Sequence, residues 1–200
     1  MPLSPPVERN KLHTREIVIA GYSRGDGLYD IEAQLSDTKA YPLPSEDRGV
    51  IAPGEKLHGM WLRMTVDGQM TIQTCEAATD YAPYTACPQA APNFARLAGL
   101  RIGRGFLKLA AERVGGTLGC THLRELLQQM ATTAFQTIGP ARAHRSMPAR
   151  GAVNAAELDK RISDQFGGPK SLVNTCLAYA EDGPVVRRRW PELTRQAAAE

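Results

Sequence analysis

Two Asp-Gly pairs constrain the fold of this chain more than any other feature. Asp26-Gly27 separates the runs HTREIVIAGYS and LYDIEAQLSDTK, and Asp67-Gly68 separates KLHGMWLRMTV and QMTIQTCEAAT. The four runs are rich in β-branched residues or alternate apolar with polar side chains, as strands do. Asp-Gly favours the tight turn of a hairpin, because glycine tolerates a positive φ. The sequence therefore predicts two antiparallel hairpins in the first half of the chain.

Helical patterns follow the hairpins. APNFARLAGL and GRGFLKLAAERVGG are each typical of a short helix that ends at glycine. The strongest helix is predicted downstream of Cys120, and Pro140 is expected to lead into a polar connector. Its apolar face comprises Leu123, Leu126, Leu127, Met130, Ala131, Ala134 and Phe135. A further helix is predicted over about residues 154–166. Hairpins followed by helices indicate an α+β fold, with an antiparallel sheet from two hairpins covered by helices on one face.

The length and composition indicate one globular core with an appended part. We expect a flexible lead-in over residues 1–11, an α+β core domain over 12–140, and a helical C-terminal extension and tail over 141–200. No apolar run approaches the roughly 20 residues that cross a bilayer. The start, MPLSPPVERNKLHTR, lacks the apolar core of a signal peptide, so we expect a cytoplasmic location.

The charge pattern argues against nucleic acid and membrane as partners. The net charge is only +3, and the one basic cluster, Arg187–Arg189, is typical of a solvated terminal segment. The first-hairpin carboxylates Asp26, Asp30 and Asp37 are interpreted mainly as surface residues. The sequence contains neither a phosphate-binding loop nor the nucleophile elbow of a hydrolase. The expected partner is another protein or a small molecule.

The four cysteines carry the most distinctive chemistry. They show no C-x-x-C spacing, and we expect free thiols in a reducing compartment. Cys75 in mid-strand and Cys176 in the apolar run VNTCLAYA are predicted to be core residues. Cys87 and Cys120 each stand just before a predicted helix, where the helix dipole favours a thiolate.

The stretch GGTLGCTH suggests a site built on Cys120 and His122. His122 could act as a second metal ligand or as a base for the thiol. Residues two apart do not share a helix face, so the pair converges only if Cys120 lies on the turn before the helix. His58 in the third strand joins this site if it lies across a cleft between sheet and helix.

Long stretches of the chain resemble a known family. The matching stretches are HTREIVIAGYSRGDGLYDIEAQLSDTKAY, the segment from LHGMWLRMTV to LAGLRIG, and GGTLGCTHLRELLQQMATTAFQTI. On these stretches the chain is identified as a member of the bacterial domain-of-unknown-function family 2889. The resemblance covers about residues 11–138. It implies no established activity.

A more distant similarity is to the iron–sulfur cluster scaffold proteins of the IscU and SufE type. It rests on the run MWLRMTVDGQMTIQTCEA, with Cys87 before one helix and Cys120 before a later one. The resemblance implies that these two residues match two of the three scaffold cysteines. The third would fall near Glu55, with His58 close by, and the scaffold order His-Cys is reversed here.

Three hypotheses of function follow. The first is a cytoplasmic accessory protein that binds a metal, an iron–sulfur cluster or a sulfur species through Cys87 and Cys120, with His58 or His122 completing the site. Thiolates favour zinc, iron or such clusters. The second is a small cysteine-dependent enzyme, with Cys120 as nucleophile and a histidine as base. The third is a non-catalytic interaction module in which these residues are structural.

Overall fold

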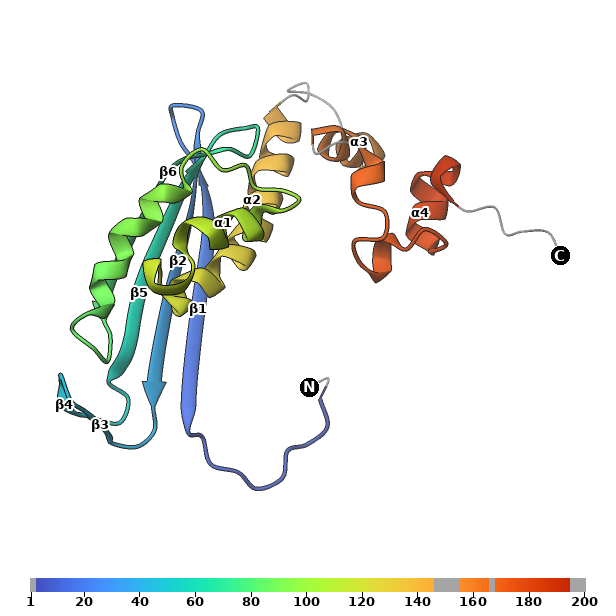
Figure 1. The fold of residues 1–200 in the computed structure, drawn as a ribbon. Coiled ribbons are helices and arrows are strands. Elements are labelled where there is room, and N and C mark those ends of the chain that lie inside the picture. The colour runs from blue at the N-terminus through green and yellow to red at the C-terminus, as the bar shows by residue number, and fades with distance from the viewer. Residues whose placement is uncertain (1–2, 146–154, 166–167, 195–200) are drawn as a thin grey trace. The chain divides into compact units, whose positions relative to one another are not determined.

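Two antiparallel hairpins form the sheet of this protein, as the Asp-Gly pairs predict. In a computed structural model, which describes residues 3–145, 155–165 and 168–194, strands β1 (His13–Ser23) and β2 (Tyr29–Lys39) pair in one hairpin. Strands β5 (Lys56–Val66) and β6 (Ile72–Tyr81) pair in the other. Strand β2 pairs antiparallel with β5, which gives a four-stranded sheet in the order β1-β2-β5-β6 (Figure 1).

The chain divides into two compact units, Met1–Ala134 and Phe135–Glu200, with the boundary inside one helix. The first unit contains the sheet and the helices that cover it. No helix among the described residues is both long and apolar enough to span a bilayer.

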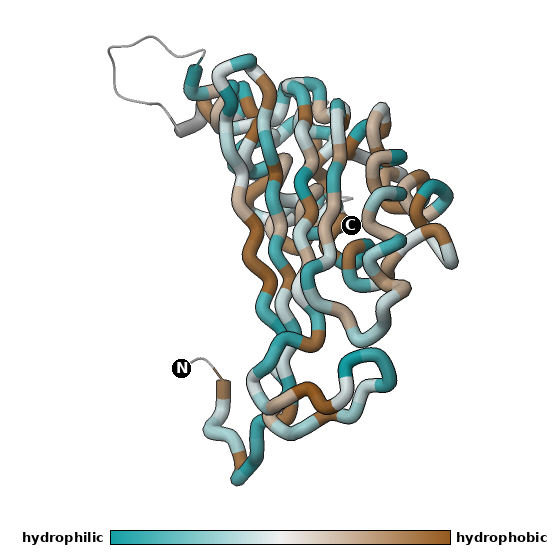
Figure 2. Tube along the Cα trace, turned by 90° about the vertical axis from the view of Figure 1, so that its left-hand side faces the viewer, coloured by the Kyte–Doolittle hydropathy of each residue, from teal (hydrophilic) through white to brown (hydrophobic). Residues whose placement is uncertain are grey.

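One face of the sheet forms the core of the first unit. Alternate residues of β2, namely Tyr29, Ile31, Ala33 and Leu35, are buried, and the residues between them are half-exposed. The strands of Figure 2 accordingly alternate between hydrophilic and hydrophobic positions. This alternation is the predicted one, and the predicted α+β class with an antiparallel sheet is confirmed.

The two hairpin turns differ in their chemistry. Gly27 has the positive φ, 87°, that the first Asp-Gly pair predicts. In the second turn Met70 adopts a positive φ of 69°, while the Asp67 carboxylate accepts hydrogen bonds from the N–H groups of Gln69 and Thr71. The long loop between the hairpins also contains a small extra hairpin, β3 (Leu43–Ser45) and β4 (Gly49–Ile51).

Helices cover one face of the sheet (Figure 1). The 3₁₀ helix η1 spans Cys87–Leu97, so it begins at Cys87 itself rather than after it. Helix α1 (Phe106–Val114) and the short η2 (Gly116–Leu118) lead to α2 (Thr121–Arg145). The predicted start of α2 is confirmed. Its buried hydrophobic residues are Leu123, Leu126, Leu127, Met130, Ala134, Ile138 and Ala143.

The prediction that Pro140 leads into a connector is wrong for the residues that the structure describes. Helix α2 continues through Pro140 to Arg145. A proline within a helix removes one backbone hydrogen bond. Buried Ile138 and Ala143 stand on either side of Pro140, and their burial offsets that loss. The rest of the predicted connector lies outside the described residues.

The second unit contains only helices in its described part. Helix α3 (Ala155–Gln165) confirms the helix predicted there. It is followed by η3 (Pro169–Ser171), η4 (Leu177–Tyr179), α4 (Pro184–Arg189) and η5 (Pro191–Leu193). The arginine cluster Arg187–Arg189 forms the last turn of α4. The prediction that Cys176 is a core residue is wrong, because it is exposed. Its apolar run forms turns followed by the short η4 and therefore has no single buried face.

Candidate functional site

Asp37 is the centre of a polar cluster inside the first unit. Strand register places Arg15 of β1 opposite Asp37 on one side and His58 of β5 opposite it on the other. Arg15 donates from Nε to Oδ1 (2.9 Å) and from a terminal nitrogen to Oδ2 (2.8 Å). His58 Nδ1 lies 2.9 Å from Oδ2, and His13 Nε2 lies 3.2 Å from Oδ1. Each carboxylate oxygen therefore has two partners, although Asp37 is only 1% exposed.

The environment keeps Asp37 ionised. Burial opposes ionisation, but the hydrogen bonds and positive charge of Arg15, helped by His58, outweigh it and lower the pKa of Asp37. Because a carboxylate only accepts hydrogen bonds, Nδ1 of His58 carries the proton. The lone pair of His58 Nε2 is left for another partner.

His122 and Cys120 reach the same cluster from the start of α2. The Arg124 N–H donates to the Cys120 carbonyl (3.0 Å), so Cys120 immediately precedes the helix. Cys120 and His122 are expected to converge only if Cys120 precedes the helix, as it does. Cys120 Sγ lies 3.9 Å from His122 Nδ1. The rings of His122 and His58 are in contact, with centroids 3.9 Å apart.

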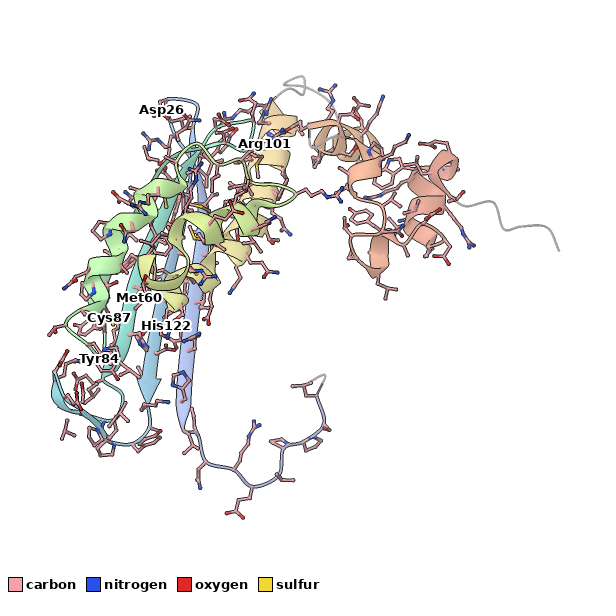
Figure 3. All side chains as sticks on the ribbon, viewed as in Figure 1. Asp26, Met60, Tyr84, Cys87, Arg101 and His122 are labelled. Atoms are coloured by element: carbon pink, nitrogen blue, oxygen red, sulfur yellow. The ribbon has the colours of Figure 1, made fainter. Side chains whose placement is uncertain are left out.

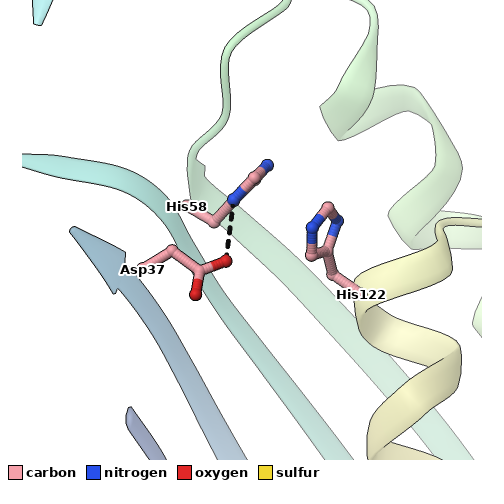
Figure 4. Close-up of side chains that lie close together, drawn as sticks. All are labelled: Asp37, His58 and His122. Carbon is pink, nitrogen blue, oxygen red and sulfur yellow. Dashed lines mark hydrogen bonds and ion pairs between the residues drawn. The ribbon is translucent and has the colours of Figure 1, made fainter. Parts of the chain in front are cut away.

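Figure 4 shows Asp37, His58 and His122 pointing toward one another from β2, β5 and α2. One potential ligand atom from each lies within 4.8 Å of the others. Burial, then repulsion from His122, lower the pKa of His58 despite the opposing effect of Asp37. The neutral imidazole, which is the form that binds metals, is therefore favoured.

Gly119 allows the close approach that brings Cys120 to this cluster. A Cβ at Gly119 would lie 1.9 Å from the carbonyl oxygen of Val114, at the end of α1. Only glycine fits this position without movement of the backbone. The glycine of the GCTH motif thus determines where Cys120 lies.

An open pocket of about 730 Å³ adjoins the cluster. In Figure 3, Met60, Tyr84, Cys87 and His122 gather toward one end of the first unit, and Asp26 and Arg101 lie toward the other. All four predicted site residues line this pocket. Its lining comprises His58, Met60, Pro83, Tyr84, Ala86, Cys87, Gln89, Ala90, Asn93, Thr117, Gly119, Cys120, Thr121 and His122.

The predicted residues differ in how closely they meet. His58, Cys120 and His122 form the continuous set just described, and Cys87 shares the pocket with them. Cys75 is buried in β6, as predicted, and burial raises the pKa of its thiol to about 12.

The interpretation of Asp37 as a surface residue is wrong, although it holds for exposed Asp26. Every second residue of β2 from Tyr29 to Leu35 is apolar and buried, and Asp37 is the next position in this series. The alternation along the strand could therefore have revealed that Asp37 is buried. His13 and Arg15 also escape prediction from sequence. Three of the four histidines of the chain meet at or beside this carboxylate.

Fold and site together define an α+β protein with a buried carboxylate–histidine pair beside a histidine- and thiol-lined pocket. The chain belongs to the family described as "Protein of unknown function (DUF2889)", whose family model matches residues 13–136, more than half of its length. Asp37, His58, Cys87, Cys120 and His122 all lie within the matched segment. Neither the curated proteins nor the solved structures include a significant match. The resemblance to the iron–sulfur scaffold proteins stays a prediction.

Proposed function

We propose that this protein is a cytoplasmic accessory protein that binds one zinc or ferrous ion through His58, Cys120 and His122. The observation that supports this proposal best is the buried Asp37–His58 pair in contact with His122, whose ring lies beside the Cys120 thiol. Metal-binding histidines commonly donate their second N–H to a carboxylate, which orients the ring. Asp37 would hold His58 in this way.

Asp37 is a poor direct ligand in this arrangement, even though it lies close to both histidines. Its two oxygens already accept two hydrogen bonds from Arg15 and one from His58, and His13 Nε2 lies 3.2 Å from Oδ1. A carboxylate offers about four acceptor positions, so three are occupied and His13 lies beside the fourth. Binding a metal directly would require loss of one of these interactions, so Asp37 is assigned the orienting role.

The spacing of Cys120 and His122 suits a tetrahedral ion. Ordinary zinc–sulfur and zinc–nitrogen bond lengths place two such ligand atoms about 3.6 Å apart. The observed separation is 3.9 Å between Cys120 Sγ and His122 Nδ1. A movement of a few tenths of an ångström would bring both atoms to bonding distance.

The donor set favours a single ion over an iron–sulfur cluster. Clusters are held mostly by four thiolates. The pocket is lined by two thiols, Cys87 and Cys120, and two imidazoles. Mixed nitrogen and sulfur ligands are typical of zinc and also suit iron.

Elemental analysis with an absorption spectrum, on protein purified without oxygen, tests the proposal. We expect about one equivalent of zinc or iron in the wild type and none in Cys120→Ser. Asp37→Asn should retain binding with about 10- to 100-fold lower affinity, because it only orients a ligand. The matched control is Cys176→Ser at an exposed thiol, which should leave the metal content unchanged.

Three outcomes would count against a single-ion site. Unchanged metal in Cys120→Ser would exclude Cys120 as a ligand. Metal loss in Cys176→Ser would show that the metal binds elsewhere. Several iron atoms with visible charge-transfer bands would instead favour the cluster-binding form of the hypothesis.

A second candidate function is a cysteine-dependent enzyme, favoured by the proximity of the Cys120 thiol and the His122 ring. A nucleophile and its base commonly lie within about 3.2 Å, and often further apart in free enzymes. This candidate predicts metal-free protein in which iodoacetamide alkylates Cys120 faster than exposed Cys176. It also predicts that His122→Gln removes the difference. Equal rates at the two thiols would exclude it.

A further inference from the structure

We propose that the pocket beside the three ligands binds a small organic carboxylate, one oxygen of which occupies the open coordination position of the metal. This inference rests on the proposed function and names the ligand class of the same site. It is carried by the donor count, the charge balance, the free amides at the start of α2 and the size of the pocket.

Three protein ligands leave one position of a tetrahedral ion open, which is typical of sites that bind a water or a substrate. His58 is only 9% exposed and lines the pocket, and Asp37 occupies its Nδ1. Its Nε2 is therefore the ligand atom, and the open position faces the pocket. The pocket volume of about 730 Å³ far exceeds one water and matches a small-molecule site.

The charge balance favours an anionic ligand. A divalent ion bound by the Cys120 thiolate and two neutral histidines carries one net positive charge. The negative charge of Asp37 is paired with Arg15, whose guanidinium also pairs with Glu125, an exposed residue outside the pocket lining. The pocket lining contains no aspartate, glutamate, lysine or arginine, so it adds no charge of its own. A monoanion balances the site.

The start of α2 distinguishes a carboxylate from other anions. The first intrahelical hydrogen bond runs from the Arg124 N–H to the Cys120 carbonyl. The N–H groups of Thr121, His122 and Leu123 therefore have no partner within the helix. A carboxylate has two oxygens, so one can bind the metal while the other accepts from these amides, where the helix dipole also favours negative charge.

The remaining walls suit the organic part of such a ligand. Met60, Pro83, Ala86 and Ala90 provide apolar surface. Asn93 donates from its amide nitrogen to the Leu118 carbonyl (2.9 Å), which leaves its amide oxygen as an acceptor beside the pocket. The wall is thus largely apolar with neutral polar groups, as ligand sites commonly are.

The test uses the full chain loaded with Co²⁺, whose visible absorption bands report its coordination. We expect benzoate to change these bands saturably, and the uncharged isostere benzamide to leave them unchanged. Ala90→Phe, which fills the pocket, should keep the Co²⁺ bands and lose at least tenfold in benzoate affinity. Ala86→Phe serves the same purpose if the first variant does not fold. The matched control is Ala95→Phe, on an exposed part of η1 outside the lining.

The outcomes separate this inference from the proposed function. Failure to bind Co²⁺ would overturn both. Co²⁺ bands that benzoate leaves unchanged would overturn the carboxylate and leave the metal site standing. If the Co²⁺ bands of the Cys87→Ser variant then differ from those of the wild type, Cys87 is the fourth ligand and occupies the coordination position assigned to the carboxylate. An equal response to benzoate and benzamide would also overturn the carboxylate.

Discussion

At the scale of single residues, Asp37 has the most demanding environment in the described part of the first unit. A buried carboxylate costs several kcal/mol unless it is paired and fully hydrogen-bonded. Arg15 and His58 supply these hydrogen bonds from two neighbouring strands, and His13 Nε2 lies 3.2 Å from the carboxylate. The same bonds hold the His58 ring in one orientation. Asp37, whose burial opposes folding unless it is paired, is therefore also the residue that orients His58.

The low pKa of His58 predicts a pH dependence of stability in the metal-free protein. Below about pH 6.5 the unfolded chain binds a proton at this histidine that the folded chain does not. We therefore expect the free energy of unfolding to fall as the pH drops from about 6.5 toward the lower folded pKa. Urea unfolding of the wild type and His58→Gln, at several pH values from about 8 to 5, measures the effect.

The comparison isolates His58, because the variant should have the shallower pH slope. Asp37 does not interfere in this range. Its lowered pKa adds stability that is lost only below about pH 4. Identical slopes in the two proteins would show that His58 protonates equally in the folded and unfolded states.

At the scale of elements, the junction of α1, η2 and α2 positions the thiol. Gly119 lies between η2 and α2, where its Cα closely approaches the end of α1. On the sheet side of the site, strand register positions the carboxylate and its partners, because Arg15, Asp37 and His58 lie opposite one another on adjacent strands. The site therefore depends on two features of the backbone: the close approach of Gly119 to α1 and the register of β1, β2 and β5.

Gly119→Ala should both destabilise the protein and weaken metal binding. The added methyl group collides with the Val114 carbonyl, so the backbone before Cys120 must shift. We expect a loss of about 1–3 kcal/mol in unfolding free energy. Thermal unfolding and a metal titration measure the two effects.

Gly103→Ala is the matched control for this substitution. A Cβ at Gly103 meets no atom within 4 Å, and its φ is not positive. Both its stability and its metal affinity should stay close to those of the wild type. Equal effects of the two substitutions would show that the contact with α1 does not position Cys120.

At the scale of the whole molecule, the candidate site lies entirely in the first unit. The residues that build the site, from His13 to His122, precede the boundary at Ala134, and the proposed ligands lie within the segment that matches the family. The described elements of the second unit contribute other features, such as the stacked Tyr179 and Trp190 rings. Metal binding should therefore not require the residues beyond α2.

A chain truncated after Arg145, at the end of α2, should keep the metal stoichiometry of the full protein. The expected readouts are an unchanged metal content and a circular dichroism spectrum with the β-sheet contribution retained. A folded fragment without metal would show that the C-terminal residues complete the site.

The sequence by itself determined the strands, the first turn and the start of α2. These features are local: alternation along β2 depends on neighbouring residues, and so does the position of Cys120 just before an amphipathic helix. The pairing of Cys120 with His122 also follows from a short stretch. For the same reason the sequence pointed to Cys120 and His122, whereas it included His58 only on the condition that a cleft between sheet and helix brings it near them.

Only the tertiary structure decided that Asp37 is buried, that Arg15 and His13 hold it, and that Cys87 shares a pocket with the cluster. These relations join residues far apart in the sequence, through strand register and helix packing. The same holds for Pro140, which lies inside α2 against the preference of proline, and for Cys176, which is exposed because its run forms turns and a short helix. Local patterns specify elements, whereas the environment of a charge depends on which elements meet around it.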